Sequence, residues 1–297
     1  MAKKIVDPHT GYLQFGNQRG VSTTHMLVKL LDTWGKALDV PNTAVRVVFL
    51  DFAKAFDRIN HHKLMDKYES FSTPPTLLRW MYSFLQGRTQ AVKIGNTISR
   101  PLSINGAVPQ GAILGLDFFT TMIDDLKAQH PVSKYVDDST PYEILKCNET
   151  STLQQSIDTI CEWSKQNDMR LNGKKTHEMT ICFKRNPPEF DPITIEEEPV
   201  DSVTCAKLVG LLIQADLKWD ANTDAILRKA PKRLYFLKRL RKAGANEKDL
   251  LRFYTGIVRP TCEYAAPAWA TSLTQGQRDK IENIQKRAFN IIRPELS

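Results

Sequence analysis

The sequence KYVDDS, residues Lys134–Ser139, lies near the middle of the chain and is the segment from which the fold can be inferred. In it an apolar, β-prone segment runs into the adjacent carboxylates of Asp137 and Asp138, and turn-forming residues follow at 139–141. This order predicts a strand, an acidic turn and a second strand. Two neighbouring aspartates repel one another unless a cation lies between them, so the turn is a candidate cation site. A solvated turn without function is the alternative.

A second predicted strand also ends on a carboxylate. Val45–Leu50 is an apolar, β-rich run that is followed by Asp51, and the next residues, FAKAFD, are typical of the start of a helix. Two such strands side by side would build a site of hard oxygen ligands for magnesium. Asp51 could instead cap the following helix. Between the two strands lies a glycine-rich loop, Asn105–Gly115, where the backbone can approach a ligand closely.

Five stretches, in this order, resemble the motifs of reverse transcriptases, and more narrowly those of jockey-like non-LTR retrotransposons. They are QFG from Gln14 with STT from Ser22, DFAKAFD from Asp51, VPQGAILG from Val108, YVDD from Tyr135 and LNGKKT from Leu171. The resemblance extends over nearly the whole chain. It implies an α+β polymerase right hand with a split βαβ palm, partial fingers and an all-helical thumb. We expect partial fingers at 1–44, palm at 45–215 with a fingers insertion at about 63–104, and thumb at 216–297.

The resemblance also implies the reaction. It is RNA-directed DNA polymerisation, by two-metal nucleotidyl transfer to the 3′ hydroxyl of a primer. Asp51, Asp137 and Asp138 would hold two Mg²⁺ ions roughly 4 Å apart, and Mn²⁺ is a possible substitute. The expected partners are an RNA template, a DNA primer and deoxynucleoside triphosphates. The alternative function is that of a truncated, inactive retroelement remnant that only binds nucleic acid.

Further site residues follow from the same resemblance. Phe56 would be the aromatic wall that excludes a 2′ hydroxyl, although it could be a core residue. Gln110-Gly111 would border the nucleotide and the template base, although a simple helix N-terminus is the alternative. Arg19 stands at a usually basic position of the fingers. Lys175 is a candidate general acid for the departing pyrophosphate, with Lys174 and a plain surface role as rivals.

The chain departs from the family pattern at two places. Asn17 and Gln18 stand where an aromatic and a basic residue are usual, and Leu116-Asp117 replaces a usual Pro-Leu. Asp117 therefore places a charge in a normally apolar helix, where we expect it to weaken packing.

The segment between Asp51 and the glycine-rich loop predicts two helices over 63–91, broken at 72–75. Trp80 and Phe84 are expected in the core of this part. A hairpin with a Gly95-Asn96 turn follows. Arg88 at its start could reach a phosphate or could be solvated.

The last part of the chain predicts helices from about Asp220. Residues 228–243 contain eight basic side chains and no acidic one. This helix would lie along a duplex backbone, which sets affinity and salt dependence; a solvated charged face is the alternative. Before it, a hairpin around Gly210 resembles the one that grips the primer strand, and this glycine would permit close approach of the backbone. The candidate nucleic-acid-binding residues of the helix are Arg228, Lys229, Lys232, Arg233, Lys238 and Arg239.

Composition limits the classes of partner and compartment. The 297-residue chain has a net charge of +8, which favours nucleic acid first and a membrane surface second. A membrane partner is not expected because the basic helix lies within a folded pattern, and no protein partner is indicated. Five widely spaced cysteines without a C-x-x-C motif suggest neither disulfides nor zinc and fit a reducing compartment. Without an apolar signal region, we expect an intracellular protein, nuclear or cytoplasmic, that is not secreted.

Overall fold

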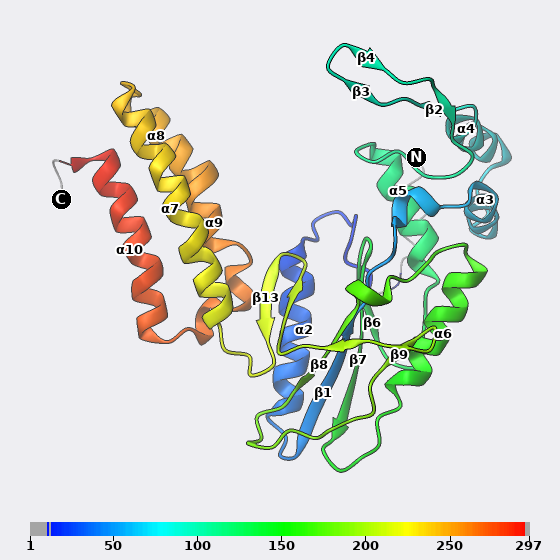
Figure 1. The fold of residues 1–297 in the computed structure, drawn as a ribbon, viewed down its shortest axis with the longest axis horizontal. Helices are drawn as coiled ribbons and strands as arrows, with labels where there is room; N and C mark the ends of the chain where they lie inside the picture. The colour runs from blue at the N-terminus through cyan, green and yellow to red at the C-terminus, as the bar shows by residue number, and fades with distance from the viewer. Residues whose placement is uncertain (1–10, 12, 295–297) are drawn as a thin grey trace.

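The structure, a computed structural model, describes residue 11 and residues 13–294. Residues 1–10 and 12 of the expected partial fingers lie outside the described residues. Helices and strands are mixed along the chain, which confirms the α+β prediction. Figure 1 shows a central sheet, a helical C-terminal region on the left, and further helices with a projecting hairpin at the upper right.

The central sheet has the strand order β11-β8-β1-β7-β6. Strand β1 (Thr43–Phe49) lies in its middle and pairs antiparallel with both neighbours. Every residue of β1 is buried, which suits its position between two neighbouring strands. The other strands are β6 (Val132–Tyr135), β7 (Asp138–Lys146), β8 (His177–Ile181) and the short β11 (Asp201–Ser202).

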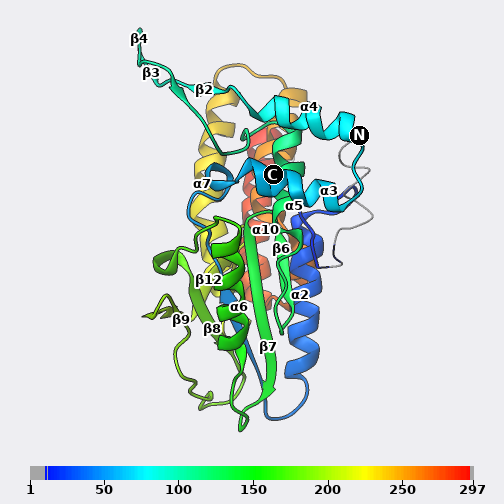
Figure 2. The same ribbon diagram turned by 90° about the vertical axis from the view of Figure 1, so that its right-hand side faces the viewer.

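The two faces of this sheet are covered by different helices. Successive side chains of a strand point to opposite faces, so Val45 and Val47 enter one core while Val48 and Leu50 enter the other. The first core includes helix α2 (Thr23–Leu38), which follows the N-cap residue Ser22, and extends into the C-terminal helices. The second core includes α5 (Ile113–Asp124) and α6 (Leu153–Gln166). Figure 2 shows α2 and α6 on opposite sides of β7.

The segment after β1 corrects one prediction. FAKAFD does not start a helix; it forms only the short 3₁₀ turn η2 (Ala55–Arg58). Lys54 adopts a left-handed conformation, with φ of +54°, and the Ala53 N–H donates to the carbonyl of Arg170 at 2.8 Å. Pairing with another segment therefore prevails over local helix propensity here.

Helices α3 (His61–Ser70) and α4 (Pro75–Leu85) follow, as predicted. The expectation that Trp80 and Phe84 lie in the core is wrong. They are 53% and 37% exposed and stack on one another with ring centroids 6.2 Å apart. Beyond α4 the chain forms a projecting hairpin, which we call the arm: β2 (Thr89–Gln90), β3 (Lys93–Ile94), β4 (Thr97–Ile98) and β5 (Leu102–Ser103).

The C-terminal region is helical, as predicted. Its long helix α7 (Asp220–Lys242) packs against α10 (Gln275–Ile292), which lies on the outer side of the molecule in Figure 1. Between them lie α8 (Glu247–Phe253), the π-helix η4 (Tyr254–Val258), α9 (Arg259–Glu263), η5 (Ala266–Ala268) and η6 (Ala270–Ser272). The expected subdomain limits after residues 44 and 215 stay a prediction.

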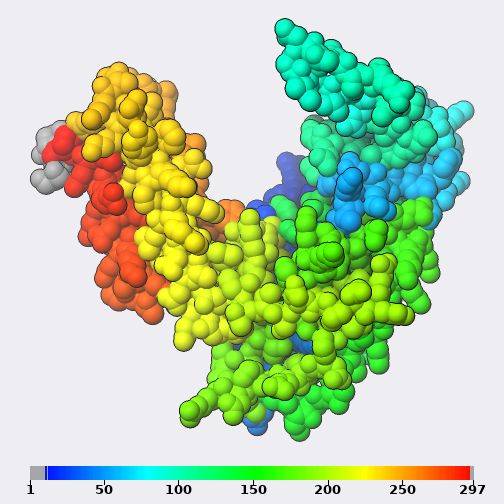
Figure 3. Space-filling view, viewed as in Figure 1, coloured from blue at the N-terminus to red at the C-terminus, as the bar shows by residue number. Residues whose placement is uncertain are grey.

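Short elements connect the sheet to these helices. They are η3 (Gly173–Lys175), the hairpin β9 (Thr194–Ile195) with β10 (Glu198–Pro199), and the hairpin β12 (Cys205–Leu208) with β13 (Leu211–Gln214). In the space-filling view of Figure 3, a hollow opens between the helical C-terminal region and the arm, with the sheet at its base. Among the described residues, no helix is both long and apolar enough to cross a membrane.

Candidate active site

The acidic turn lies between β6 and β7. Tyr135 pairs with Asp138, so the two turn residues are Val136 and Asp137. The predicted turn formers at 139–141 instead lie within β7, which corrects the position of the turn by about two residues. Val136 has a φ of +57°, a strained conformation for a β-branched residue. Strain of this kind persists only where the surroundings hold it in place.

The contact that holds this turn comes from Gly16. A Cβ atom at this glycine would lie only 2.4 Å from the backbone nitrogen of Val136. Residues 13–15 also pair with β6, since the Phe15 N–H donates to the carbonyl of Lys134 at 2.8 Å. The predicted QFG motif therefore packs directly against the acidic turn.

Asp51 reaches the same end of the sheet through backbone pairing. The Leu50 N–H donates to the carbonyl of Ser139 at 3.0 Å, which places Asp51 beside the start of β7. Its own backbone is held by the LNGKKT segment: the Asn172 N–H donates to the Asp51 carbonyl at 2.8 Å, and the Asp51 N–H donates to Thr176 Oγ1 at 3.2 Å. The segments of three predicted motifs thus meet around this aspartate.

The electrostatics of the three carboxylates show that they act on one another. Burial and the negative charges of Asp137 and Asp51 together raise the pKa of Asp138 to about 6, while Lys207 of β12 lowers it. Burial and the charge of Asp51 also raise the pKa of Asp137. Mutual repulsion is expected where a cation normally balances the charge.

The donor set fits magnesium in its chemistry. Mg²⁺ prefers carboxylate oxygens, and three carboxylates come from neighbouring strand ends. Within the described residues, however, no group of three or more His, Cys, Asp or Glu side chains is arranged to hold a metal ion as it stands. Repulsion between like charges favours side chains that point apart, so the carboxylates would have to turn toward a bound ion.

We expect replacement of Asp138 by Asn to raise the melting temperature in the absence of divalent ions at neutral pH. The raised pKa means that the folded state binds a proton more tightly than the unfolded state. The stability that the protonated Asp138 side chain contributes is therefore fully present below about pH 4 and is lost as the pH rises through about 6. The gain in melting temperature from Asn should accordingly vanish in acid. Thermal melts across this range test the prediction, with the exposed Asp66 of α3 replaced by Asn as the control. Equal shifts of the melting temperature in both variants would contradict it.

The loop before α5 is fastened to η2 and the residues after it. The Val108 N–H donates to the carbonyl of Phe56 at 3.0 Å, and the Ala107 N–H donates to that of Ile59 at 3.0 Å. Phe56 is half-buried and stacks on Phe119 of α5, with ring centroids 4.5 Å apart. One side of its ring therefore packs as a core residue does, while the residue keeps an exposed part.

Gln110 and Gly111 stand exposed at the start of α5. Gly111 has a φ of +82° and no atom within 4 Å of an added Cβ, so its conformation, and not crowding, explains the glycine. Gly115 is different, because a Cβ there would lie 2.1 Å from the carbonyl oxygen of Pro109. The loop thus folds closely over the first turn of α5.

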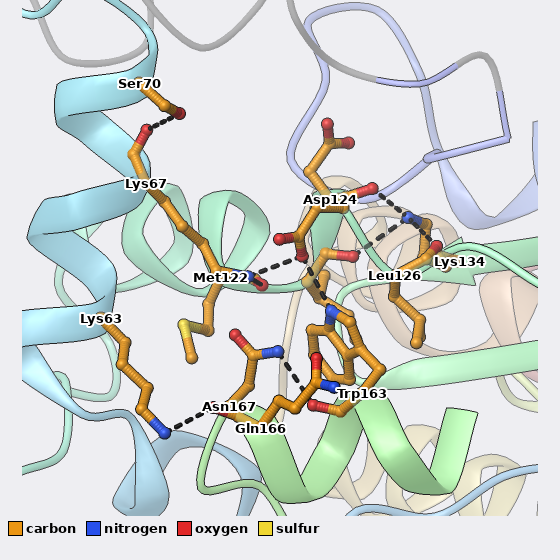
Figure 4. A network of polar contacts seen from close by, with 12 residues as sticks. Lys63, Lys67, Ser70, Met122, Asp124, Leu126, Lys134, Trp163, Gln166 and Asn167 are labelled. Atoms are coloured by element: carbon orange, nitrogen blue, oxygen red, sulfur yellow. Dashed lines mark hydrogen bonds and ion pairs between the residues drawn. The ribbon is translucent and has the colours of Figure 1, made fainter. Parts of the chain in front are cut away.

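Sequence reasoning missed the role of Lys134. This lysine is 4% exposed, and its Nζ donates to three carbonyl oxygens at the end of α5, as Figure 4 shows. Burial lowers its pKa to about 8. A cation at a helix C-terminus is favourable, so Lys134 ties the strand of the acidic turn to the helix of the glycine-rich loop. A lysine inside an apolar strand was the available signal. The three carbonyls are those of Ile123, Asp124 and Leu126, at 3.0, 2.7 and 3.2 Å.

Two residues that depart from the family pattern, one near the N-terminus and one in α5, contact one another. Asn17 Nδ2 donates to Asp117 Oδ1 at 2.6 Å, and Asp117 is only 5% exposed. Asn17 has a φ of +56°, which asparagine tolerates better than most residues. The buried charge is therefore paired, and it links the loop at Gly16 to α5.

Asn17→Ala should lower the free energy of unfolding by about 1–3 kcal/mol, because a buried carboxylate loses a donor. In an Asp117→Leu background the same change should cost much less, since no buried charge is left there. Urea denaturation of the four proteins measures the coupling. Equal costs of Asn17→Ala in both backgrounds would show that the hydrogen bond contributes nothing.

The remaining predicted substrate residues lie at the surface. Lys174 and Lys175 are both exposed on η3, and Arg19 is exposed in the turn before α2. Lys174 lines a pocket of about 920 Å³ together with Arg58 and Arg170, and Lys175 does not. The choice between the two lysines stays open.

The β12–β13 hairpin lies against the C-terminal helices. Gly210 has a φ of +91°, and an added Cβ would come within 3.1 Å of the ring of Tyr264. The Tyr264 hydroxyl donates to the carbonyl of Val209 at 2.5 Å. The close approach that this glycine permits is thus to Tyr264, and approach to a primer strand stays a prediction. Beside it lies a pocket of about 580 Å³ with basic residues Lys207, Arg228 and Lys229.

All six basic residues predicted on α7 to bind nucleic acid are exposed. Arg241 has another role, since its Nη1 donates to the carbonyl of Ile292 at 2.9 Å near the end of α10. The predicted six are Arg228, Lys229, Lys232, Arg233, Lys238 and Arg239, and none of their side chains has a hydrogen bond or ion pair within the described part of the chain.

Comparison with known families decides the assignment. The family described as reverse transcriptase (RNA-dependent DNA polymerase) matches residues 1–216. The chain belongs to the reverse transcriptase family. Members of this family generally use divalent metal ions. A second family, described as alkylated DNA repair protein alkB homolog 8, N-terminal, matches residues 219–259.

Curated relatives agree. The reverse transcriptase chain is 27% identical over 304 residues to the probable RNA-directed DNA polymerase from transposon BS of Drosophila melanogaster, covering 98% of this chain and 33% of that protein. It is 29% identical over 181 residues to the RNA-directed DNA polymerase from mobile element jockey of the same species, covering 57% and 20%. The prediction of a jockey-like non-LTR reverse transcriptase domain is confirmed. The chain spans about a third of the length of the curated relatives it matches.

Solved structures support the fold. The match to telomerase from Candida tropicalis in complex with the TWJ fragment of telomeric RNA covers 98% of this reverse transcriptase chain and 49% of the telomerase chain. Its TM-score is 0.54, at 14% sequence identity. Apo telomerase from the same organism matches 99% and 49%, with a TM-score of 0.51 and 12% identity. The fold is that of a polymerase right hand, as predicted.

Proposed function

We propose that this chain is the polymerase core of a non-LTR retrotransposon protein and copies RNA into DNA. The observation that carries the proposal is the meeting of Asp51, Asp137 and Asp138 at one end of the sheet. Family membership supports the reaction class. RNA template, DNA primer and deoxynucleoside triphosphates are the proposed substrates and partners.

The charge of the segments on the two sides of the hollow supports the proposal. No acidic residue occurs between 70 and 116, the stretch that holds α4, the arm and the Gln110 loop. None occurs between 225 and 246, which holds most of α7. Acid-free segments on both sides of the hollow would attract polyanions, while the three neighbouring aspartates would attract cations.

Asp51, Asp137 and Asp138 would hold two Mg²⁺ ions, for which Mn²⁺ can substitute because it also takes carboxylate ligands. When bound, these ions lower the charge on the triphosphate and assist the attack of the primer hydroxyl. Because the pKa of Asp138 is raised to about 6, this side chain would release a proton upon binding a cation at a pH near or below that value.

The remaining residues position the reactants. Phe56, fixed against Phe119, would lie under the sugar and exclude a 2′ hydroxyl. Gln110 and the backbone of Gly111 would border the nucleotide, and Arg19 would contact its phosphates. Lys175, or its neighbour Lys174, would donate a proton to the leaving pyrophosphate.

The helical C-terminal region, from residue 216, would be the thumb. Its exposed basic residues on α7 would bind the backbone of the duplex without reading its sequence. Gly210 would lie near the primer strand. We place the protein inside the cell, in nucleus or cytoplasm, because nucleic-acid templates occur there and all five cysteines are free.

Primer extension on a defined RNA template tests the function. Purified protein should extend an annealed DNA primer with deoxynucleotides in the order that the template dictates. Phe56→Ala should retain extension and admit ribonucleotides more readily. Salt-sensitive binding without any extension would instead support a remnant that only binds nucleic acid.

A further inference from the structure

Two of the five cysteines lie beside one another at the end of the sheet opposite the acidic turn. Cys147 directly follows β7 and Cys182 directly follows β8, and their sulfur atoms are 3.9 Å apart. The structure describes all five cysteines, and no other two of them have sulfur atoms in contact. Spacing along the chain does not reveal this pair, because 35 positions separate its members.

The pair lies at the start of β1, the strand between β7 and β8. The Cys147 N–H donates to the carbonyl of Asn42 at 2.7 Å, and the Cys182 thiol lies 3.9 Å from the carbonyl oxygen of Thr43. Asn42 has a φ of +61°, which is not an extended conformation, so the strand does not continue before Thr43. The two sulfurs therefore meet just beyond the end of the strand that separates β7 from β8.

Small reagents can reach both sulfurs. Each of the two cysteines is partly exposed, and Cys182 lines a pocket of about 540 Å³. Burial and the neighbouring Cys182 thiol raise the pKa of Cys147, while the positive charge of Lys184 lowers it. The net effect is a raised pKa, so the pair rests as a dithiol at neutral pH until an oxidant is present.

We propose that Cys147 and Cys182 form a reversible disulfide, which joins the ends of β7 and β8 under oxidising conditions. Disulfides inside cells are usually transient and respond to the redox state, and a pair that is reduced at rest fits this pattern. The proposal does not depend on the function proposed above.

Glutathione disulfide is an oxidant of the required class. One cysteine thiolate attacks a sulfur of glutathione disulfide and displaces a glutathione thiolate, which leaves a mixed disulfide on the protein. The second cysteine thiolate attacks the protein sulfur of that mixed disulfide and displaces the other glutathione thiolate. The protein loses two electrons and two protons, and glutathione disulfide gains them as two thiols.

The bond requires a small movement and has a defined effect. Bonded sulfurs lie about 2 Å apart, so the two sulfurs must approach by roughly 2 Å. Both cysteines lie one position beyond their strands, where rotation of the side chains and a small shift of the chain supply this movement. The bond closes a loop that holds α6, η3 and β8, which restricts the unfolded chain and stabilises the folded one. The three aspartates lie at the other end of the sheet, so the bond leaves them in place.

Peptide mapping tests the proposal. Folded wild-type protein is incubated with glutathione disulfide, the remaining thiols are alkylated, and unreduced peptides are identified by mass spectrometry. We expect a cross-linked peptide that contains Cys147 and Cys182, with two hydrogens fewer than the reduced pair. The melting temperature should rise by about 5 °C or more, and a dithiol reductant should reverse both changes.

Three variants sharpen the test. Cys147→Ser and Cys182→Ser should show neither the cross-link nor the rise in melting temperature, and should carry glutathione on the remaining cysteine. Cys205→Ser, which removes an exposed cysteine outside the pair, is the matched control and should behave as the wild type.

Wild-type protein whose two cysteines stay reduced, or each bind glutathione without a cross-link, would overturn the proposal. So would a disulfide between two protein molecules, which a band of twice the mass on a non-reducing gel would show. A cross-link that leaves the melting temperature unchanged would overturn its stabilising role. None of these outcomes depends on polymerase activity, so this proposal and the proposed function can fail separately.

Discussion

Replacement of Asp51 by Asn is expected to reduce magnesium-dependent primer extension by about 1,000-fold or more. The change removes one negative charge from a site that would hold two cations, and a loss of about 4 kcal/mol of transition-state stabilisation gives that factor. Single-nucleotide incorporation under single-turnover conditions measures it, with Asp66→Asn on α3 as a charge-matched control that should stay near the wild type.

The fold should survive this change. Asp51 is held through its backbone, by Asn172 and Thr176, and Asn keeps these groups. Binding of the duplex should therefore be retained. Asp51→Asn protein with a tenth or more of the wild-type rate would show that this carboxylate is not a metal ligand.

Gly16→Ala is expected to damage both stability and activity. Its Cβ would lie 2.4 Å from the Val136 nitrogen and 2.8 Å from Val136 Cγ2, and a backbone atom cannot move aside as a flexible side chain can. Relief requires either a shift of the acidic turn or a break in the pairing with β6. We expect a loss of about 1–3 kcal/mol, typical of overpacking, and a fall in kcat of about tenfold or more.

The matched control is Gly35→Ala in α2. A Cβ at Gly35 has no atom within 4 Å, so alanine there should stabilise the helix by about 0.5–1 kcal/mol. Urea denaturation and primer extension compare the two variants. Gly16→Ala protein as stable and as active as the wild type would mean that the turn does not depend on this contact.

The elements that local pattern controls were predictable. Helices α3 and α4 form on either side of the predicted break, and the chain from Asp220 is helical as expected, because capping and amphipathic spacing act over a few residues. The strand β1 was predicted from its run of apolar, β-prone residues in the same way. In each case the interactions that decide the structure join residues that are close together in the sequence.

Errors arose where distant segments decide the conformation. The turn lies at Val136 because β6 precedes it and because Gly16, more than a hundred residues earlier in the sequence, packs against it. FAKAFD does not form an α-helix because Ala53 pairs with Arg170. Asp117 was expected to weaken packing, and its pairing with Asn17 could not be read from either segment alone.

The nearness of the three candidate carboxylates was predictable, and the contacts that support them were less so. Asp51, Asp137 and Asp138 come together as two strand ends and a turn predict. The buried Lys134, which ties β6 to α5, was missed because a lysine in a strand gives no sign of the helix end that it will meet. The roles of Phe56 and Lys175 stay predictions.

The most direct measurement is a magnesium titration of single-nucleotide incorporation on an RNA template, with wild-type and Asp137→Asn proteins side by side. The account predicts saturable, magnesium-dependent incorporation by the wild type and none above background by the variant, with equal duplex binding by both. Equal incorporation by both proteins, or incorporation by the wild type without any divalent ion, would contradict the claim that these carboxylates form the metal site of a polymerase.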